Sequence, residues 1–201
     1  MQFSATLLVA LAVLGAARAH CPPPTHRPRL GGKTPFHVDQ FSGAWHVVAR
    51  AVDGSLPLPT EGVVCSKLSF APRPDDNLTR TDITVTMKTA DGAEAEFHSK
   101  AQSSPCTQSS MQIVWQIPGQ DTWIGVGHLT VLATDYEQFA VDTFTKESYN
   151  PDKDLVERLT VSEVLSRTPV LDEKVLAALK SVVASLGFDA SDVKDVDTSG
   201  C

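Results

Sequence analysis

The sequence lacks a second long hydrophobic run and lacks any excess of basic residues. Its one apolar run, Leu7 to Ala17, is shorter than the roughly 20 residues of a membrane-spanning helix, and it ends in the small-residue pattern Ala17, Arg18, Ala19. This pattern predicts a secretory signal peptide over residues 1–19, and hence a secreted, extracellular protein with no membrane span. The formal net charge of −7 argues against nucleic acid as a partner.

Catalytic and metal-binding signatures are also missing. The sequence contains no GxSxG, no HExxH and no glycine-rich phosphate-binding loop, and its 6 histidines are scattered. His46 and His98 lie on polar strand faces, which is the ordinary position of a solvated side chain. The wide spacing of the 4 cysteines excludes the paired CxxC arrangement of a structural zinc site. We therefore expect no metal site and no obligatory cofactor.

The cysteines and one sequon are features of an exported chain. An even number of cysteines predicts two disulfides, although four cysteines allow three pairings and their spacing does not choose among them. The cysteines are Cys21, Cys65, Cys106 and Cys201. The sequon that starts at Asn77 follows turn-forming prolines, so we expect Asn77 to be an exposed glycosylation site.

The chain that follows the signal peptide has the length of one domain. Residues 20–40 are rich in proline and basic residues without an apolar period, and we expect them to form an extended N-terminal arm. Residues 41–201 are expected to form the folded domain. In this region eight segments alternate between apolar and polar residues, which is typical of strands. They are residues 41–51, 65–70, 80–89, 93–101, 111–117, two segments within 124–144, and 155–165.

One helix is predicted near the C-terminus, over about residues 171–187. An apolar stripe at helical spacing includes Leu176, Leu179 and Val183, and Gly187 is a natural stop. Eight short antiparallel strands followed by one amphipathic helix favour an all-β fold, because a closed sheet buries one face and leaves no edges. We predict an eight-stranded antiparallel up-and-down β-barrel with the helix packed outside. A barrel of this size has room for one small ligand.

Strand alternation predicts which side chains line the barrel. Trp45, Val47 and Ala49 share one face of the first strand, and Arg50 lies on the other. If the tryptophan faces inward, the matching residues of the neighbouring strands form an apolar pocket. The candidate ligand-binding residues on these strands are Val47, Ala49, Leu68, Phe70, Val85, Met87, Ile113 and Trp115.

Three short motifs resemble the signatures of the lipocalin family. They are Gly43-Ala44-Trp45 at the first strand, Thr134-Asp135-Tyr136 between two late strands, and Arg167 after the last strand. The segments VLATDYEQFAV and VLSRTPVLDEKVLAAL are most similar to the branch of apolipoprotein D and the insect bilin-binding proteins. The resemblance covers nearly the whole mature chain. It implies a calyx whose floor is closed by Trp45, with Arg167 stacked across the indole.

The same resemblance implies a disulfide from Cys65 to Cys201 that ties the tail to the second strand. Alternation supports it, because Cys65 shares a face with Lys67 and Ser69 and should point outward. Relatives commonly have a cysteine on the strand after Thr134-Asp135-Tyr136, but this chain has none there. Cys106 is then left as the partner of Cys21.

Two acidic residues complicate an apolar interior. The family alignment places Asp142 and Glu163 on inward faces, where an unpaired charge is costly. One interpretation places both carboxylates near a wet barrel mouth. The other has them accept hydrogen bonds from N–H or hydroxyl groups of a ligand, which would favour a bilin or a hydroxylated terpenoid over a plain fatty acid.

The leading functional hypothesis is a secreted carrier of a small hydrophobic molecule, with no reaction catalysed. Biliverdin or another bilin, a carotenoid, a retinoid, a sterol and a fatty acid all suit an apolar cup. One alternative is a thiol-dependent isomerase of the prostaglandin-synthase type, which would need a free thiol at Cys65. The other is a lipocalin that acts through its loops, as a homo-oligomer or on a cell-surface receptor.

Overall fold

The computed structural model describes residues 32–33, 35–54, 62–73, 79–104, 107–116 and 120–201. The predicted signal peptide, the glycosylation site at Asn77 and the cysteines Cys21 and Cys106 lie outside the described residues. The predictions that rest on these residues stay predictions.

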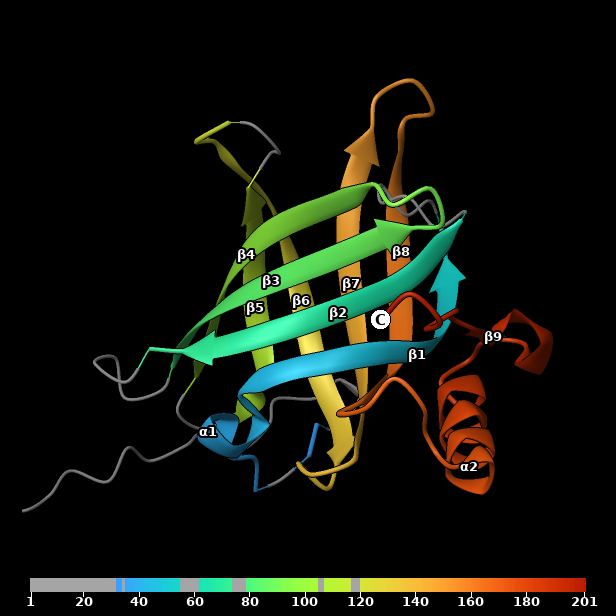
Figure 1. Cartoon of the computed structure of the whole chain (residues 1–201). Helices are drawn as coiled ribbons and strands as arrows, with labels where there is room; N and C mark the ends of the chain where they lie inside the picture. The colour runs from blue at the N-terminus through green and yellow to red at the C-terminus, as the bar shows by residue number, and fades with distance from the viewer. Residues whose placement is uncertain (1–31, 34, 55–61, 74–78, 105–106, 117–119) are drawn as a thin grey trace, which may run out of the picture.

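Eight long antiparallel strands close into a barrel, as predicted from the sequence (Figure 1). Successive strands are neighbours from β2 to β8, and β1 pairs with both β8 and β2, so the sheet closes on itself. The strands are β1 Gly43–Asp53, β2 Val63–Pro72, β3 Arg80–Thr89, β4 Glu94–Ser104, β5 Thr107–Gln116, β6 Trp123–Thr134, β7 Phe139–Asn150 and β8 Leu155–Ser166. The helical elements are α1 Val38–Phe41, α2 Glu173–Ala184 and the 3-10 turn η2 Ala190–Asp192.

The described end of the predicted N-terminal arm is not simply extended. Val38–Phe41 forms one helical turn, and Phe36, Val38 and Phe41 are buried in the same interior cluster as Trp45. These apolar side chains recur at short intervals, so a compact turn buries them together where an extended segment would expose some of them. This turn therefore belongs to the core at one end of the barrel.

The helix α2 packs outside the barrel, as predicted, and defines a second core (Figure 1). Its Leu179 and Val183 contact Val141 and Val164, which point outward from β7 and β8. The carboxylate of Asp172 caps the helix by accepting from the backbone N–H groups of Lys174 and Val175. The sheet is thus buried on both faces beneath α2, which explains the unbroken burial of residues 140–143 on β7 and 161–166 on β8.

A bulge in β1 overturns one prediction from strand alternation. The register between β1 and β8 shifts between Val47 and Ala49. Val47 remains in the interior cluster, but Ala49 and Ala51 pack in the outer cluster beneath α2. Because a bulge adds one residue to the strand, it reverses the faces that follow. Ala49 was therefore wrongly predicted to line the barrel, and Arg50 takes an inward position instead.

The C-terminal tail inserts between β1 and β2 where these strands diverge. The pairing of β1 with β2 extends only from Gly43 to His46. Beyond this point the short strand β9, Lys194–Asp195, pairs with β1, and Gly200 N–H donates to the Val64 carbonyl at 2.9 Å. The chain terminus lies between β1 and β2 in Figure 1. The polar composition of the tail gave no signal for this strand.

Candidate functional site

The barrel floor is built around Trp45. Its side chain is fully buried, its indole N–H donates to the Phe41 carbonyl at 2.9 Å, and its ring stacks on that of Phe41 with centroids 4.9 Å apart. The guanidinium carbon of Arg167 lies 3.7 Å from the centroid of the Trp45 ring, which is the contact that the resemblance implied. Stacking, a cation–π contact and a satisfied indole N–H together stabilise this end of the barrel.

Arg167 also links three segments through their backbone carbonyls. Its Nε donates to Tyr136 at 3.2 Å, Nη1 to Ala44 at 3.0 Å and Nη2 to Gln40 at 3.1 Å. Gly43 has a φ of 91°, and a Cβ at this position would lie 3.4 Å from Nη1. Glycine therefore fits both the left-handed backbone and the approach of the guanidinium.

The Thr134-Asp135-Tyr136 motif folds the turn that receives Arg167. The Asp135 carboxylate accepts from the backbone N–H groups of Glu137, Gln138 and Phe139 at 3.1, 2.9 and 2.9 Å. The Thr134 hydroxyl accepts from the Tyr136 N–H at 2.8 Å, and Tyr136 adopts a φ of 69°. The motif is therefore a turn that presents the Tyr136 carbonyl to Arg167, and it offers no reactive group.

The interior cluster brings together most of the apolar residues proposed to line the barrel. Val47, Leu68, Phe70 and Ile113 are buried in it, and Val85 and Trp115 pack against it while remaining partly exposed. Met87 is buried on the same face of β3 as Val85. Sequence reasoning missed Phe144, whose ring packs edge-on against Trp115 with centroids 4.8 Å apart. Phe144 lies two residues after Asp142 on β7, so strand alternation could have predicted that it faces inward.

A belt of charged and polar groups lies inside the barrel, next to the Trp45 floor. Its members are the next inward-facing residues of their strands beyond the floor. Arg50 Nε donates to the Glu163 carboxylate at 2.6 Å, and Arg50 Nη2 donates to the Ser66 hydroxyl at 3.2 Å. Asp142 pairs with Glu163 in the register of β7 and β8. We call these four residues the ionic belt. Sequence reasoning missed both Arg50 and Ser66. The bulge that turns Arg50 inward has no sequence signal, whereas Ser66 lies two residues from Leu68 on β2 and could have been found by alternation.

Asp142 is the exceptional member of the ionic belt. It is 1% exposed, and its Oδ2 has no hydrogen-bond partner. Burial raises its pKa well above the ordinary value, Glu163 raises it further, and Arg50 opposes both effects. With Glu163 only 9% exposed, the interpretation that placed these carboxylates at a wet mouth is wrong. The barrel holds both carboxylates in a buried layer, where Arg50 supplies one compensating charge.

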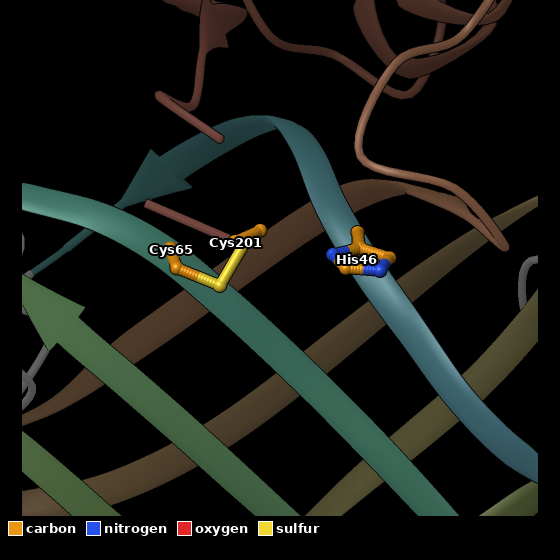
Figure 2. Close-up of side chains that lie close together, drawn as sticks. All are labelled: His46, Cys65 and Cys201. Carbon is orange, nitrogen blue, oxygen red and sulfur yellow. A yellow bond between two sulfur atoms is a disulfide. The ribbon is translucent and has the colours of Figure 1, made fainter. Parts of the chain in front are cut away.

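The disulfide between Cys65 and Cys201 is present, as the resemblance implied. His46 on β1 lies beside it, with ligand-type atoms of the three residues all within 4.8 Å of one another (Figure 2). The His46 Nδ1 is buried without a partner, and burial, followed by Lys67, lowers the His46 pKa. Since the two sulfurs are bonded to each other, Cys65 and Cys201 form a covalent anchor for the tail, beside which His46 lies.

Comparison with known proteins assigns the family. Residues 42–200 match the model of the lipocalin / cytosolic fatty-acid binding protein family. The chain belongs to this family. None of the curated proteins matches it by sequence. The family resemblance is thereby confirmed, whereas the apolipoprotein D branch stays a prediction.

Solved lipocalin structures support the barrel fold. Insecticyanin from the tobacco hornworm Manduca sexta is 20% identical with a TM-score of 0.61, and the match covers 88% of each chain. Lobster apocrustacyanin A1 is 14% identical with a TM-score of 0.55, over 79% of this chain and 77% of that one. Among the described residues, no helix combines the length and apolar character needed to cross a membrane.

Proposed function

We propose that this lipocalin is a secreted carrier that binds a small, largely apolar molecule inside its barrel. The observation that carries the proposal is the unequal burial of its inward-facing apolar side chains. Trp45, Phe41 and Phe70 at the floor are at most 1% exposed, whereas Val85, Trp115 and Phe144 face the same interior and stay partly exposed. Covering such surface with an apolar ligand is favourable at about 25 cal/mol per Å².

The proposed ligand site combines the partly exposed residues with the layer beneath them. Leu68 lies across from Val85 in the β2–β3 register, and Ile113 lies two residues before Trp115 on β5. These side chains, together with Met87, would contact the ligand, while Val47 and Phe70 would support them from below. Bilins, carotenoids, retinoids, sterols and fatty acids remain the ligand classes that suit such a lining.

Secretion is part of the proposal and has its own test. Removal of residues 1–19 would leave His20 as the first residue of the exported chain, and Asn77 would carry a glycan. Mass spectrometry of the protein exported from insect cells, before and after glycosidase treatment, measures both. An intact N-terminus on the exported protein would contradict the assignment of the signal peptide.

The thiol-dependent isomerase is not supported. That reaction needs a free thiol inside the barrel, and Cys65 is bonded to Cys201. Cys65 also alternates with the inward-facing Ser66 and therefore points away from the interior.

Titration with the neutral apolar dye Nile red tests the carrier function. Val85→Glu puts a charge on the proposed lining, whereas Thr84→Glu puts the same charge on the opposite face of β3, one residue away. We expect Val85→Glu to weaken binding about tenfold or more, and Thr84→Glu to leave it within about twofold, provided both unfold cooperatively. Equal effects of the two substitutions, or no saturable binding by the unmodified protein, would contradict the proposal.

A further inference from the structure

The ionic belt has one more negative group than positive group. Asp142 and Glu163 are both carboxylates, whereas Arg50 is the only cation that interacts with them among the described residues. Arg50 is already committed to Glu163 at 2.6 Å and to Ser66 at 3.2 Å. When Asp142 is ionised, its unpartnered Oδ2 therefore lacks both a hydrogen-bond donor and a compensating positive charge.

The neighbours of Asp142 on each strand offer no other compensation. Glu163 faces it from β8 and Arg50 interacts with it from β1, while its register partner on β6 is the apolar Val131. On β7 itself the nearest cation is Lys146, four residues and about 13 Å along the strand. The Lys146 ammonium lies over the Trp115 ring, 5.7 Å from its centroid.

Buried acceptors without a partner are rare in native proteins. Those that persist commonly bind a water molecule or an ion, or have a functional role. A water molecule could supply a donor but not a charge. The belt also retains a small accessible face, because the side chains of Arg50 and Glu163 are 10% and 11% exposed. Because Glu163 and Asp142 are register partners, a group that reached Glu163 would arrive beside Asp142.

We propose that the ionic belt binds the ammonium group of an apolar amine whose hydrocarbon part occupies the layer of Val85, Trp115 and Phe144. This inference rests on the proposed carrier function and names its ligand class. An ammonium supplies the absent charge together with three N–H donors, which suffice for Asp142 and Glu163 at once. A neutral ketone or ether supplies neither a donor nor a charge, and a carboxylate adds a third negative group.

Proton release on binding is a second property expected of an ammonium site at Asp142. The raised pKa of Asp142 means that the ligand-free protein holds a proton on this carboxyl over a range where an exposed aspartate is ionised. A bound ammonium stabilises the ionised form, so the proton leaves when the amine binds. Amine affinity should consequently rise with pH across the window between the bound and free pKa values of Asp142. Binding of a neutral alcohol should show no such rise.

Calorimetric titration with decylamine, 1-decanol and decanoate tests the proposal, since the three ligands share one hydrocarbon chain. We expect decylamine to bind about tenfold tighter than 1-decanol or better, and decanoate to bind most weakly. Repeating the decylamine titration in two buffers of different ionisation enthalpy should reveal proton release on binding.

Two isosteric variants complete the test. Asp142→Asn should bring the decylamine and 1-decanol affinities to within about threefold, while Glu147→Gln, an exposed position on the same strand, should keep the difference. Equal binding of amine and alcohol by the unmodified protein, or an amine preference that survives Asp142→Asn, would overturn the ammonium site and leave the carrier function intact. Failure of all three ligands to bind would overturn both.

Discussion

The floor of the barrel and the ionic belt each contain a guanidinium, but they differ in how its neighbouring polar groups are paired. Arg167 stacks on Trp45 and donates to three backbone carbonyls, whose segments it holds together. Arg50 neutralises Glu163 and leaves the Asp142 carboxyl with an orphan oxygen. Paired polar groups stabilise the folded protein. A buried polar group without a partner destabilises it, and a ligand that supplies the partner removes that destabilisation. We infer that the floor serves stability and the belt serves recognition.

The largest difference should come from two tryptophans that face the same interior. Trp45→Ala removes a fully buried ring and should lower the free energy of unfolding by about 3–5 kcal/mol. Trp115→Ala removes a partly exposed ring and should cost less than half as much while weakening ligand binding. Urea denaturation measures both costs. Equal destabilisation by the two substitutions would mean that Trp45 at the floor and Trp115 farther along the interior contribute equally to stability.

Removing the cation of the belt should be the next largest effect. Arg50→Met leaves Glu163 and Asp142 buried together without compensation, so we expect a loss of about 3 kcal/mol at neutral pH. The loss should shrink in acid, because lowering the pH neutralises the uncompensated negative charge. Arg158→Met, which breaks an exposed pair with Glu147, is the control and should cost less than about 1 kcal/mol. An equally small effect at Arg50 would show that the belt is hydrated.

The floor should distinguish arginine from lysine. Arg167→Lys keeps the charge over Trp45. A lysine cannot make all three carbonyl contacts, because it lacks the planar guanidinium group. We expect a loss of about 1–2 kcal/mol in the free energy of unfolding, measured by denaturant titration. Full stability in this variant would mean that the cation–π contact alone closes the floor.

Asp142 should make the protein less stable as the pH rises. Its pKa is raised on folding, so the folded state binds more protons, and stability falls with pH between the unfolded and folded pKa values. Asp142→Asn should flatten this part of the profile and stabilise the protein at neutral pH, because the amide stays neutral without binding a proton. The free energy of unfolding of both proteins is measured by urea denaturation across this pH range. Parallel pH profiles would contradict a raised pKa at Asp142.

Alternation and spacing were sufficient to predict the barrel, the outer helix and the apolar interior, because these depend on local periodicity. They failed where a single residue changed the register. The bulge after Val47 moved Ala49 outward and Arg50 inward, and the favourable pairing of Arg50 with Glu163 depends on strands that are far apart in sequence. The β9 pairing of the polar tail was invisible for a similar reason, since the backbone contacts of Lys194 and Asp195 with β1 carry no side-chain pattern.

We expect ligands to bind in the barrel interior beyond the Trp45 floor, against Val85, Trp115 and Phe144. Methyl-resolved NMR during titration with 1-decanol tests it most directly, since the inner and outer cores both contain valines. We predict saturable shifts at Val85 and Ile113, with little change at Val48, Val164 and Val183 in the outer core between α2 and the barrel. Shifts confined to those outer valines would contradict the claim, because the ligand would then bind between the helix and the barrel wall.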